Sequence, residues 1–481
     1  MRKVLFGAIV PAALVAAVVT FGFWRVETPR PAPVAVVEPC EWQQMQVECG
    51  TVRVPENHAD PDGPTIELFL VIARATGQPT DDPVFYFSGG PGTASSGSLR
   101  LAQAHAELRR TRDFVFLDQR GTGRSHPLAC ESPDTPVRHL GPYFVRDEVV
   151  ACRAALESRA DLRRYTTADA ARDLDLVRRA LGYERLNVMG TSYGTRMAWT
   201  YAAMFPEHAR TLLLVGPVPP GFRVPLPFSH GFDVALEGLL AACEADAACR
   251  AAYPSLRADT DRAFDRLRAG PVPVRVSALP STGVEAFMTY GEFAEAVRYM
   301  LYAAERARML PSLLTRAAAG DYSPIANFAV ANRRNLSRAI AMGMYLSVTC
   351  AEDLPFIDAD TLREATDGTR LGDYRVAQQQ AACDEWVRGD GPDPSTTVPI
   401  QTSALLEVGV FDPASPPADA RAAMPLLPNG RLIEVPHAGH ATGGVGIDDC
   451  LMDLERTFIE HGHARDLDVS CVQSARRPSF Q

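Results

Sequence analysis

One ten-residue run, Leu186-Asn-Val-Met-Gly-Thr-Ser-Tyr-Gly-Thr195, combines a short apolar strand, a tight turn at Ser192 and the start of a helix. Gly190 and Gly194 flank the serine in the pattern Gly-x-Ser-x-Gly. Glycines at these two positions let a strained strand-to-helix turn pack closely, and the turn then raises the serine hydroxyl above the sheet. Because a strand precedes the pattern and a helix follows it, we interpret Ser192 as a nucleophile and not as a structural turn residue.

Strands and helices alternate around this turn. Residues 83–92 form an apolar strand that runs into a Gly-Gly-Pro-Gly loop, and residues 114–125 form a second apolar strand that also ends in a loop. Between them, residues 99–110 are predicted to be helical, as in a β-α-β unit. A helix is expected over 166–182 and a further buried strand over 211–218. This alternation predicts an α/β fold with a mostly parallel central sheet and helices on both faces.

The chain changes character twice along its length. Residues 40–73 have the pattern of antiparallel strands, whereas residues 228–380 are rich in Ala, Leu, Arg and Glu at helical spacing. Apolar strands return at 402–409 and 431–435, so we expect a helical cap domain inserted into the sheet domain. The predicted segments are a signal peptide or N-terminal membrane anchor (1–27), a Pro-rich spacer (28–39), the first part of the sheet domain (40–220), the helical cap (221–400) and the C-terminal part of the sheet domain (401–481).

The N-terminus has the pattern of an export signal. Arg2 and Lys3 precede an apolar run over residues 4–24. Such a segment is either a cleaved secretion signal or an uncleaved membrane anchor, and both interpretations stay open. Either one exports the rest of the chain. We therefore expect a periplasmic or secreted protein that meets the membrane only through this segment.

The ten cysteines agree with export, because structural disulfides persist in oxidising compartments. The sequence has no Cys-x-x-Cys pair and no histidine cluster at ligand spacing, so we predict no metal site and no cofactor. Sequence alone permits many disulfide connectivities. Pairing consecutive cysteines closes five short loops, and on this basis we predict the pairs Cys40–Cys49, Cys130–Cys152, Cys243–Cys249, Cys350–Cys383 and Cys450–Cys471.

The composition excludes one class of partner. The 481 residues are 46% hydrophobic and 22% charged, and the formal net charge is −10. A nucleic-acid-binding protein needs a basic stripe to neutralise phosphates, and this sequence has none. We therefore expect a globular protein that does not bind nucleic acid.

A serine hydroxyl is a weak nucleophile at neutral pH and needs a base that a carboxylate orients. In proteins with this kind of turn, the carboxylate and then the histidine follow the serine along the chain. Asp412 follows a late strand and His440 follows the last strand, at the edge where a sheet delivers functional side chains. His440 is preferred to His437 because it follows a glycine in a loop. Asp412 is preferred to Asp419, which is expected on the next helix.

The reaction also needs hydrogen-bond donors for a developing oxyanion. One should be the backbone N–H of Tyr193, the residue after the nucleophile. The second should come from the loop after the earlier strand, Gly89-Gly90, with Gly90 preferred. The candidate oxyanion hole is therefore Gly90 and Tyr193.

These motifs, in this order, resemble the prolyl-aminopeptidase and tripeptidyl-aminopeptidase group of α/β hydrolases. The resemblance spans roughly residues 40 to 475 and includes a C-terminal region like that of the tripeptidyl aminopeptidases. The matching motifs are Gly89-Gly-Pro-Gly92, Asp118-Gln-Arg-Gly-Thr-Gly-Arg-Ser125, Gly190-Thr-Ser-Tyr-Gly-Thr195, Cys350-Ala-Glu-Asp353, Cys383-Asp-Glu-Trp386, Asp412-Pro-Ala-Ser-Pro-Pro417 and Gly439-His440.

The resemblance implies an α/β-hydrolase fold with an inserted helical cap. It also implies an exported serine peptidase that releases residues or short peptides from peptide N-termini through an acyl-enzyme. Its substrate would be a peptide with a free N-terminus, whose amino group binds carboxylates in or near the cap. Glu352 and Asp353 are the candidates for that role; capping a helix beside a disulfide is the alternative. The chain departs from the group's pattern at Ala441, which follows His440 at a position where a Gly or Ser is common. This departure affects the expected shape of the loop that carries His440.

Two other functions compete with the peptidase. The same group includes esterases and hydrolases of small amides or lactones, so a carboxylesterase or small-molecule amide or lactone hydrolase with the same triad is the first alternative. The second is a hydrolase-like binding module without catalytic activity. The sequence speaks against the second, because the nucleophile, acid, base and oxyanion loop are all present.

Overall fold

The structure, a computed structural model, describes residues 34–277, 283–389, 391 and 398–481. The predicted signal or anchor over 1–27 and the first residues of the predicted spacer lie outside this part of the chain. Residues 35–39 of that spacer belong instead to a strand, β1 (Ala35–Trp42), which pairs with β2 (Met45–Pro55). Pro39 is tolerated there because β1 is the edge strand of its sheet.

The described residues form one nine-stranded sheet with the order β1-β2-β3-β5-β4-β6-β7-β10-β11. The first three strands are antiparallel to their neighbours, as is the β3–β5 pair, and every pair from β5 onward is parallel. The mostly parallel sheet was predicted from the alternation of elements. The remaining strands are β3 (Thr65–Ala73), β4 (Val84–Phe87), β5 (Phe114–Leu117), β6 (Leu186–Thr191), β7 (Ala209–Val215), β10 (Ser403–Gly409) and β11 (Gly430–Val435).

Apolar layers cover both faces of this sheet. Leu212 and Leu214 of β7 pack in one cluster with helices α4 and α5, and Leu213 packs in another with α1 and α17. Successive side chains of a strand point to opposite faces, so a strand buried on both sides must be apolar throughout. This requirement explains the continuous apolar runs in the sequence. The helices of these layers and their neighbours are α1 (Leu101–Ala104), α4 (Thr167–Ala180), α5 (Tyr193–Met204), α16 (Pro417–Ala423) and α17 (Asp448–His461).

The predicted helix over 99–110 is broken into two pieces. Helix α1 ends at Ala104, with His105 as its C-cap, and a short 3-10 helix follows at Leu108–Arg110. The ring of His105 is buried and stacks on Phe114 of β5. The helix is interrupted where His105 packs against the sheet. The sequence has no glycine or proline at this position that would have predicted the interruption.

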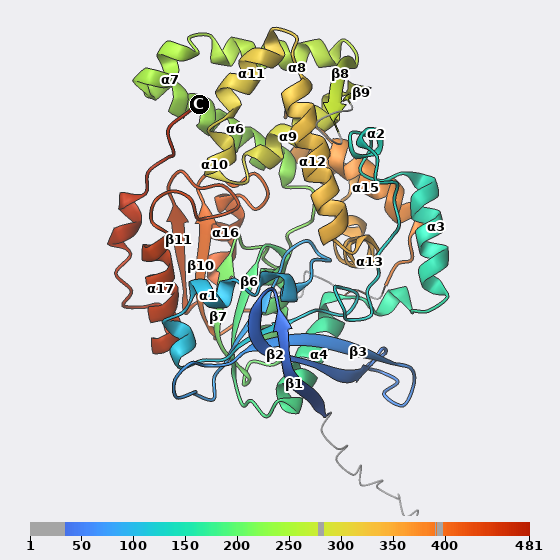
Figure 1. The fold of residues 1–481 in the computed structure, drawn as a ribbon, viewed down its shortest axis with the longest axis vertical. Coiled ribbons are helices and arrows are strands. Elements are labelled where there is room, and N and C mark those ends of the chain that lie inside the picture. Colours follow the sequence, from blue (N-terminus) through green and yellow to red (C-terminus); the bar gives the residue numbers. More distant parts are fainter. Residues whose placement is uncertain (1–33, 278–282, 390, 392–397) are drawn as a thin grey trace, which may run out of the picture. The chain divides into compact units, whose positions relative to one another are not determined.

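Between β7 and β10, the described residues form ten helices, α6 to α15 (Figure 1). In Figure 1, α6 to α12 lie at the end of the sheet toward which β11 points. Helices α2 (Pro136–His139) and α3 (Arg146–Glu157) come from the earlier part of the chain, yet they pack against α12 and α15. The ten helices are α6 (Phe228–Ala245), α7 (Ala247–Ala252), α8 (Leu256–Arg268), α9 (Tyr290–Met300), α10 (Ala304–Ala307), α11 (Leu310–Ala318), α12 (Ser323–Ala339), α13 (Met342–Glu352), α14 (Ala359–Thr366) and α15 (Tyr374–Glu385).

The region predicted to be helical also contains an antiparallel hairpin, β8 (Val272–Ser277) and β9 (Gly283–Met288). Val272, Val274 and Val276 are buried, and the residues between them are exposed. This period of two is the signature of a half-buried strand, and it was available in the sequence. It was missed because the surrounding composition is strongly helical.

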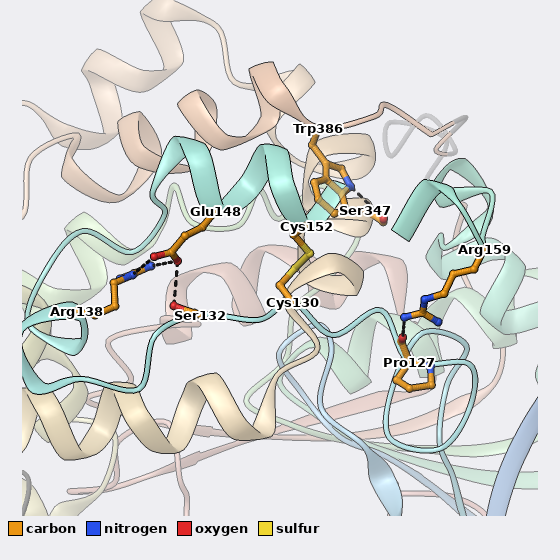
Figure 2. The surroundings of a disulfide bond; sticks show 9 residues. All are labelled: Pro127, Cys130, Ser132, Arg138, Glu148, Cys152, Arg159, Ser347 and Trp386. Atoms are coloured by element: carbon orange, nitrogen blue, oxygen red, sulfur yellow. Dashed lines mark hydrogen bonds and ion pairs between the residues drawn. A yellow bond between two sulfur atoms is a disulfide. The ribbon is translucent and has the colours of Figure 1, made fainter. Parts of the chain in front are cut away.

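All five predicted disulfides are present. Figure 2 shows the pair Cys130–Cys152, which ties the segment before α2 to helix α3. Beside it the Trp386 indole Nε1 donates a hydrogen bond to Ser347 Oγ, 3.1 Å away. The bridge holds α3 to the segment before α2, and α3 itself packs against α13 and α15, which come much later in the sequence.

Candidate active site

Ser192 stands between β6 and α5 with φ +56° and ψ −126°, a conformation that few non-glycine residues adopt. Its backbone N–H donates to Val215 O at 2.8 Å, which fixes the turn to β7. A Cβ atom added at Gly190 would lie 2.3 Å from Gly194 O, and one at Gly194 would lie 2.1 Å from Phe87 O. Both glycines of the motif are thus required by close backbone packing, and the serine carries the strain.

Asp412 and His440 come together after β10 and β11. The His440 Nδ1 atom lies 2.7 Å from Asp412 Oδ2. Asp412 Oδ1 also accepts from the backbone N–H groups of Ala414 (2.7 Å) and Ser415 (2.9 Å), and the Ser415 hydroxyl donates to Oδ2 at 2.8 Å. Asp412 is 2% exposed, and an ionised carboxylate only accepts hydrogen bonds. The His440 proton therefore sits on Nδ1, which leaves Nε2 free to accept a proton.

The two rival residues take other positions. His437 has φ +65°, and its Nδ1 atom is buried without a hydrogen-bond partner. Burial and the charges of Arg477 and Arg476 lower the pKa of His437. Asp419 lies on α16, as expected, and burial raises the pKa of its carboxyl group. The hydrogen bond to Asp412 therefore belongs to His440.

Ser192 and His440 line one cavity of about 60 Å³. Gly90 and Tyr193, the predicted oxyanion donors, line the same cavity. Gly90 has φ +114°, which is a backbone conformation open to glycine and strained for other residues. The geometry thus brings nucleophile, base and both predicted donors to one place.

Two family models match parts of this chain. A model described as the alpha/beta hydrolase fold matches residues 82–280, and a model described as TAP-like protein matches residues 369–471. The chain has the α/β-hydrolase fold.

Individual relatives agree with this. The hydrolase is 27% identical to the tripeptidyl aminopeptidase of Streptomyces lividans, over 89% of this chain and 84% of that protein. It is 30% identical to the serine protease Hip1 of Mycobacterium tuberculosis, over 44% of this chain and 45% of Hip1. A crystal structure of a proline iminopeptidase from Mycobacterium smegmatis aligns at 15% identity with a TM-score of 0.39, covering 86% of this chain and 98% of that one. The family models and the first two relatives confirm the predicted fold class, family resemblance and enzyme class, a serine hydrolase.

Glu352 and Asp353 of the hydrolase are buried and fully engaged. Glu352 accepts from the backbone N–H of Thr167 (2.6 Å) and from its hydroxyl (2.7 Å), at the start of α4. Asp353 accepts from Arg196 at 2.8 Å. Neither carboxylate is among the residues that line the Ser192 cavity. The Glu352 contacts match the alternative role, capping a helix, and Asp353 forms an ion pair with Arg196; neither set of contacts supports the expected binding of a substrate amino group.

The contacts of Glu352 continue to the nucleophile turn. The Thr167 hydroxyl that donates to Glu352 lies 2.8 Å from the Tyr193 hydroxyl. Burial raises the pKa of Tyr193, so its hydroxyl stays protonated and can donate. A chain of buried hydrogen bonds thus holds Tyr193, whose backbone is a predicted oxyanion donor, to α4 and α13.

Four tyrosines and one arginine of the cavity wall were missed by sequence reasoning: Tyr143, Tyr299, Tyr302, Tyr345 and Arg375. They come from the segment before α3, from α9 and the turn after it, and from α13 and α15. In the sequence they resemble ordinary core residues of amphipathic helices, and only folding brings them together. The spacing of Tyr299 and Tyr302, three residues apart, was the one available signal, since it places both on one side of a helix.

Tyr302 touches the catalytic end of the site directly. Its ring meets the His440 imidazole edge-on, with 4.9 Å between centroids. Arg298 donates to the Tyr302 hydroxyl at 2.9 Å and holds the ring in place. The turn after α9 thereby supplies part of the cavity wall next to His440.

Proposed function

We propose that this hydrolase is an exported serine aminopeptidase that releases residues or short peptides from peptide N-termini. The observation that carries the proposal is the Asp412–His440 hydrogen bond of 2.7 Å on the wall of the cavity that contains Ser192. The peptide substrate follows from the relatives, which include a tripeptidyl aminopeptidase and a serine protease. A free N-terminus agrees with a small covered cavity, because a chain end enters such a space more easily than the middle of a chain.

In the proposed reaction, His440 Nε2 takes the proton of the Ser192 hydroxyl while Oγ attacks the carbonyl carbon of the scissile bond. Asp412 holds the imidazole in the correct tautomer and stabilises its positive charge. The backbone N–H groups of Gly90 and Tyr193 receive the oxyanion. His440 then gives its proton to the departing amine, and an acyl-enzyme remains on Ser192. A water molecule attacks the ester by the same route, which releases the N-terminal fragment and restores the hydroxyl.

One observation favours the alternative function. Among the described residues that line the cavity there is no aspartate or glutamate, so no carboxylate faces the place where a cationic N-terminus would sit. A carboxylesterase or a small-molecule amide or lactone hydrolase needs no such group. It would use the same triad and the same oxyanion donors.

A panel of fluorogenic substrates separates the two functions. It contains proline, alanine and tripeptide amides, each with a free and an acetylated N-terminus, beside short neutral esters. We expect the free amides to be cleaved with a higher kcat/KM than their acetylated forms. Wild-type indifference to acetylation, or turnover of the esters alone, would reverse the order of the two functions. The Ser192→Ala variant supplies the background rate for every substrate.

The proposed location rests on the cysteines. Five disulfides are typical of proteins in oxidising compartments. Within the described residues, no helix combines the length and the apolar character needed to cross a bilayer. We propose that residues 1–27 direct export to the periplasm or the medium, either as a cleaved signal or as a retained anchor. We also propose a cap over 221–400, between sheet-domain parts at 40–220 and 401–481.

A further inference from the structure

Arg375, on α15, is a buried cation on the wall of the Ser192 cavity. It is 2% exposed, and its Nε and Nη1 atoms have no hydrogen-bond partner. A buried donor without a partner costs free energy, and a charged donor costs more than a neutral one. Such a group is retained when a ligand supplies the missing acceptors.

The nearest carboxylate does not satisfy Arg375. Glu295 on α9 lies 3.6 Å from Arg375 Nε. Both Glu295 oxygens already accept from Arg298, whose Nε and Nη2 atoms each lie 3.0 Å away. The Arg298–Glu295 pair is therefore a two-pronged ion pair, and Arg375 is left with only a longer electrostatic contact.

The charges of this part of the cap do not balance. Three guanidinium groups (Arg298, Arg333, Arg375) surround two carboxyl groups, Glu292 and Glu295. Burial raises the pKa of Glu292, which moves that group toward its neutral form. Burial lowers the pKa of Arg375, but Glu295 together with Tyr345, Tyr143 and Tyr299 raises it by more, so the guanidinium stays charged. The cluster beside the cavity therefore has at least one positive charge in excess.

The guanidinium of Arg375 is also held in place. Its Cζ atom lies 3.8 Å from the centre of the Tyr143 ring, and the Cζ atom of Arg333 lies 3.7 Å from the same centre. Two cations thus contact one aromatic ring, and Tyr143 lines the cavity beside Arg375. A planar guanidinium fixed in this way presents its donors in a preorganised fork, which suits a carboxylate better than a carbonyl.

Building on the proposed hydrolysis at Ser192, we propose that Arg375 binds a carboxylate of the substrate and makes the enzyme selective for anionic substrates. The carboxylate has two possible sources. It is either an acidic side chain on the released fragment or the C-terminal carboxylate of a short peptide substrate. Both sources offer an anionic oxygen to the guanidinium, whose Nε and Nη1 donors have no hydrogen-bond partner.

Matched substrates test this selectivity in the wild type. The first pair is Ala-Ala-Glu and Ala-Ala-Gln coupled to the same fluorogenic amine. The second pair is one tetrapeptide as free acid and as C-terminal amide. We expect one pair to show a preference for the carboxylate of about 10- to 100-fold in kcat/KM, the range of a hydrogen bond to a charged group. A wild type that treats both members of both pairs alike overturns the proposal.

Variants then assign the preference to Arg375. In Arg375→Met the preference for the carboxylate should be lost through a higher KM for the anionic member, and Arg375→Lys should retain part of it, since it keeps the charge without the fork. Arg333→Met is the matched control, because it removes the cation on the same ring of Tyr143 but does not line the cavity. An undiminished preference in Arg375→Met, or an equal loss in Arg333→Met, contradicts the proposal.

Failure of the peptidase proposal can be distinguished from failure of the carboxylate-binding proposal. If the wild type cleaves esters but none of the peptides, a succinic acid half ester is compared with the butyrate of the same alcohol. Preference for the half ester, lost in Arg375→Met, supports carboxylate binding although the enzyme is an esterase. Equal rates on the two esters overturn the inference independently of the natural reaction.

Discussion

Two buried arginines, Arg120 in the sheet domain and Arg375 on α15, differ in how many of their hydrogen-bond donors have partners. Arg120 is fully buried, and its Nε and Nη2 atoms donate to the two oxygens of Asp173 at 2.7 Å each. Its Nη1 atom donates to the carbonyl oxygens of Glu56 and Arg164, also at 2.7 Å. Arg375 is equally buried, yet two of its nitrogens have no partner.

This difference in hydrogen bonding distinguishes an arginine that stabilises the fold from one that is available to bind a ligand. Arg120 ties the loop after β5 to the end of β2 and to α4, and it has no donor left for a ligand. Arg375 contributes less to holding elements together and keeps its donors beside a cavity. A buried charge whose hydrogen bonds are complete is part of the scaffold, whereas one with open donors next to a cavity indicates a binding role.

The largest effect is expected at the nucleophile, which places the chemistry in the sheet domain. Ser192→Ala should lower kcat by at least about 10⁴-fold, because no other group can form the acyl-enzyme. Labelling by a fluorophosphonate should disappear, while the unfolding curve stays that of the wild type. Turnover at wild-type rates in this variant would show that the site lies elsewhere.

Next in size is the loss of the scaffold arginine. Arg120→Met leaves the buried Asp173 carboxylate without its main cationic partner and with only His58 beside it, so we expect the free energy of unfolding to fall by about 3–5 kcal/mol. Arg375→Met should cost much less stability, because Glu295 keeps its two bonds to Arg298. Urea unfolding of both variants checks this ordering. Equal losses would remove the distinction between a structural and a binding arginine.

A smaller effect is expected for the carboxylate first considered for substrate binding. Glu352→Gln removes the charge that accepts from Thr167 and should cost about 1–3 kcal/mol of stability. Because Thr167 contacts Tyr193 of the nucleophile turn, peptide and ester turnover should fall by the same factor. A loss confined to peptides with a free amino group would instead restore Glu352 as the amino-group receptor.

The smallest expected effect concerns a buried carboxyl group on β10 that has no hydrogen-bond partner. Glu407 on β10 is fully buried, neither oxygen has a hydrogen-bond partner, and burial raises its pKa from 4.5 to about 8. Its buried neighbour Glu455 has a raised pKa as well, and the pKa of His105, which faces Glu455, is lowered to about 4.

The sign of the pH effect follows from these shifts. Above pH 6.5, His105 is neutral in the folded protein and carries less than half a proton in the unfolded protein, so the two carboxyl groups dominate. The folded state binds more protons than the unfolded state, and stability must fall as the pH rises toward 8. Glu407→Gln should flatten this decline between pH 6.5 and 8 in unfolding curves. A decline as steep as in the wild type would show that Glu407 is not its source.

The sequence by itself predicted the candidate catalytic residues and the frame that carries them. Gly190 and Gly194 indicate a tight turn at Ser192, and the short apolar runs of β4, β5, β6 and β7 indicate buried strands, so local pattern was sufficient. The order of Ser192, Asp412 and His440 followed from the way a parallel sheet collects loops at one edge. Consecutive cysteines paired as expected because each pair closes a short loop.

The tertiary structure alone decided what surrounds that machinery. Tyr143, Tyr302 and Arg375 lie in three distant segments, and no local pattern distinguishes them from helix core residues until the cap folds over the sheet. The role of Glu352 was undecidable for the same reason, since its partner Thr167 is 185 residues away. The proposed substrate contacts of this hydrolase depend on long-range packing of side chains, whereas its predicted nucleophile depends on the backbone of one turn, and only the second leaves a recognisable pattern in the sequence.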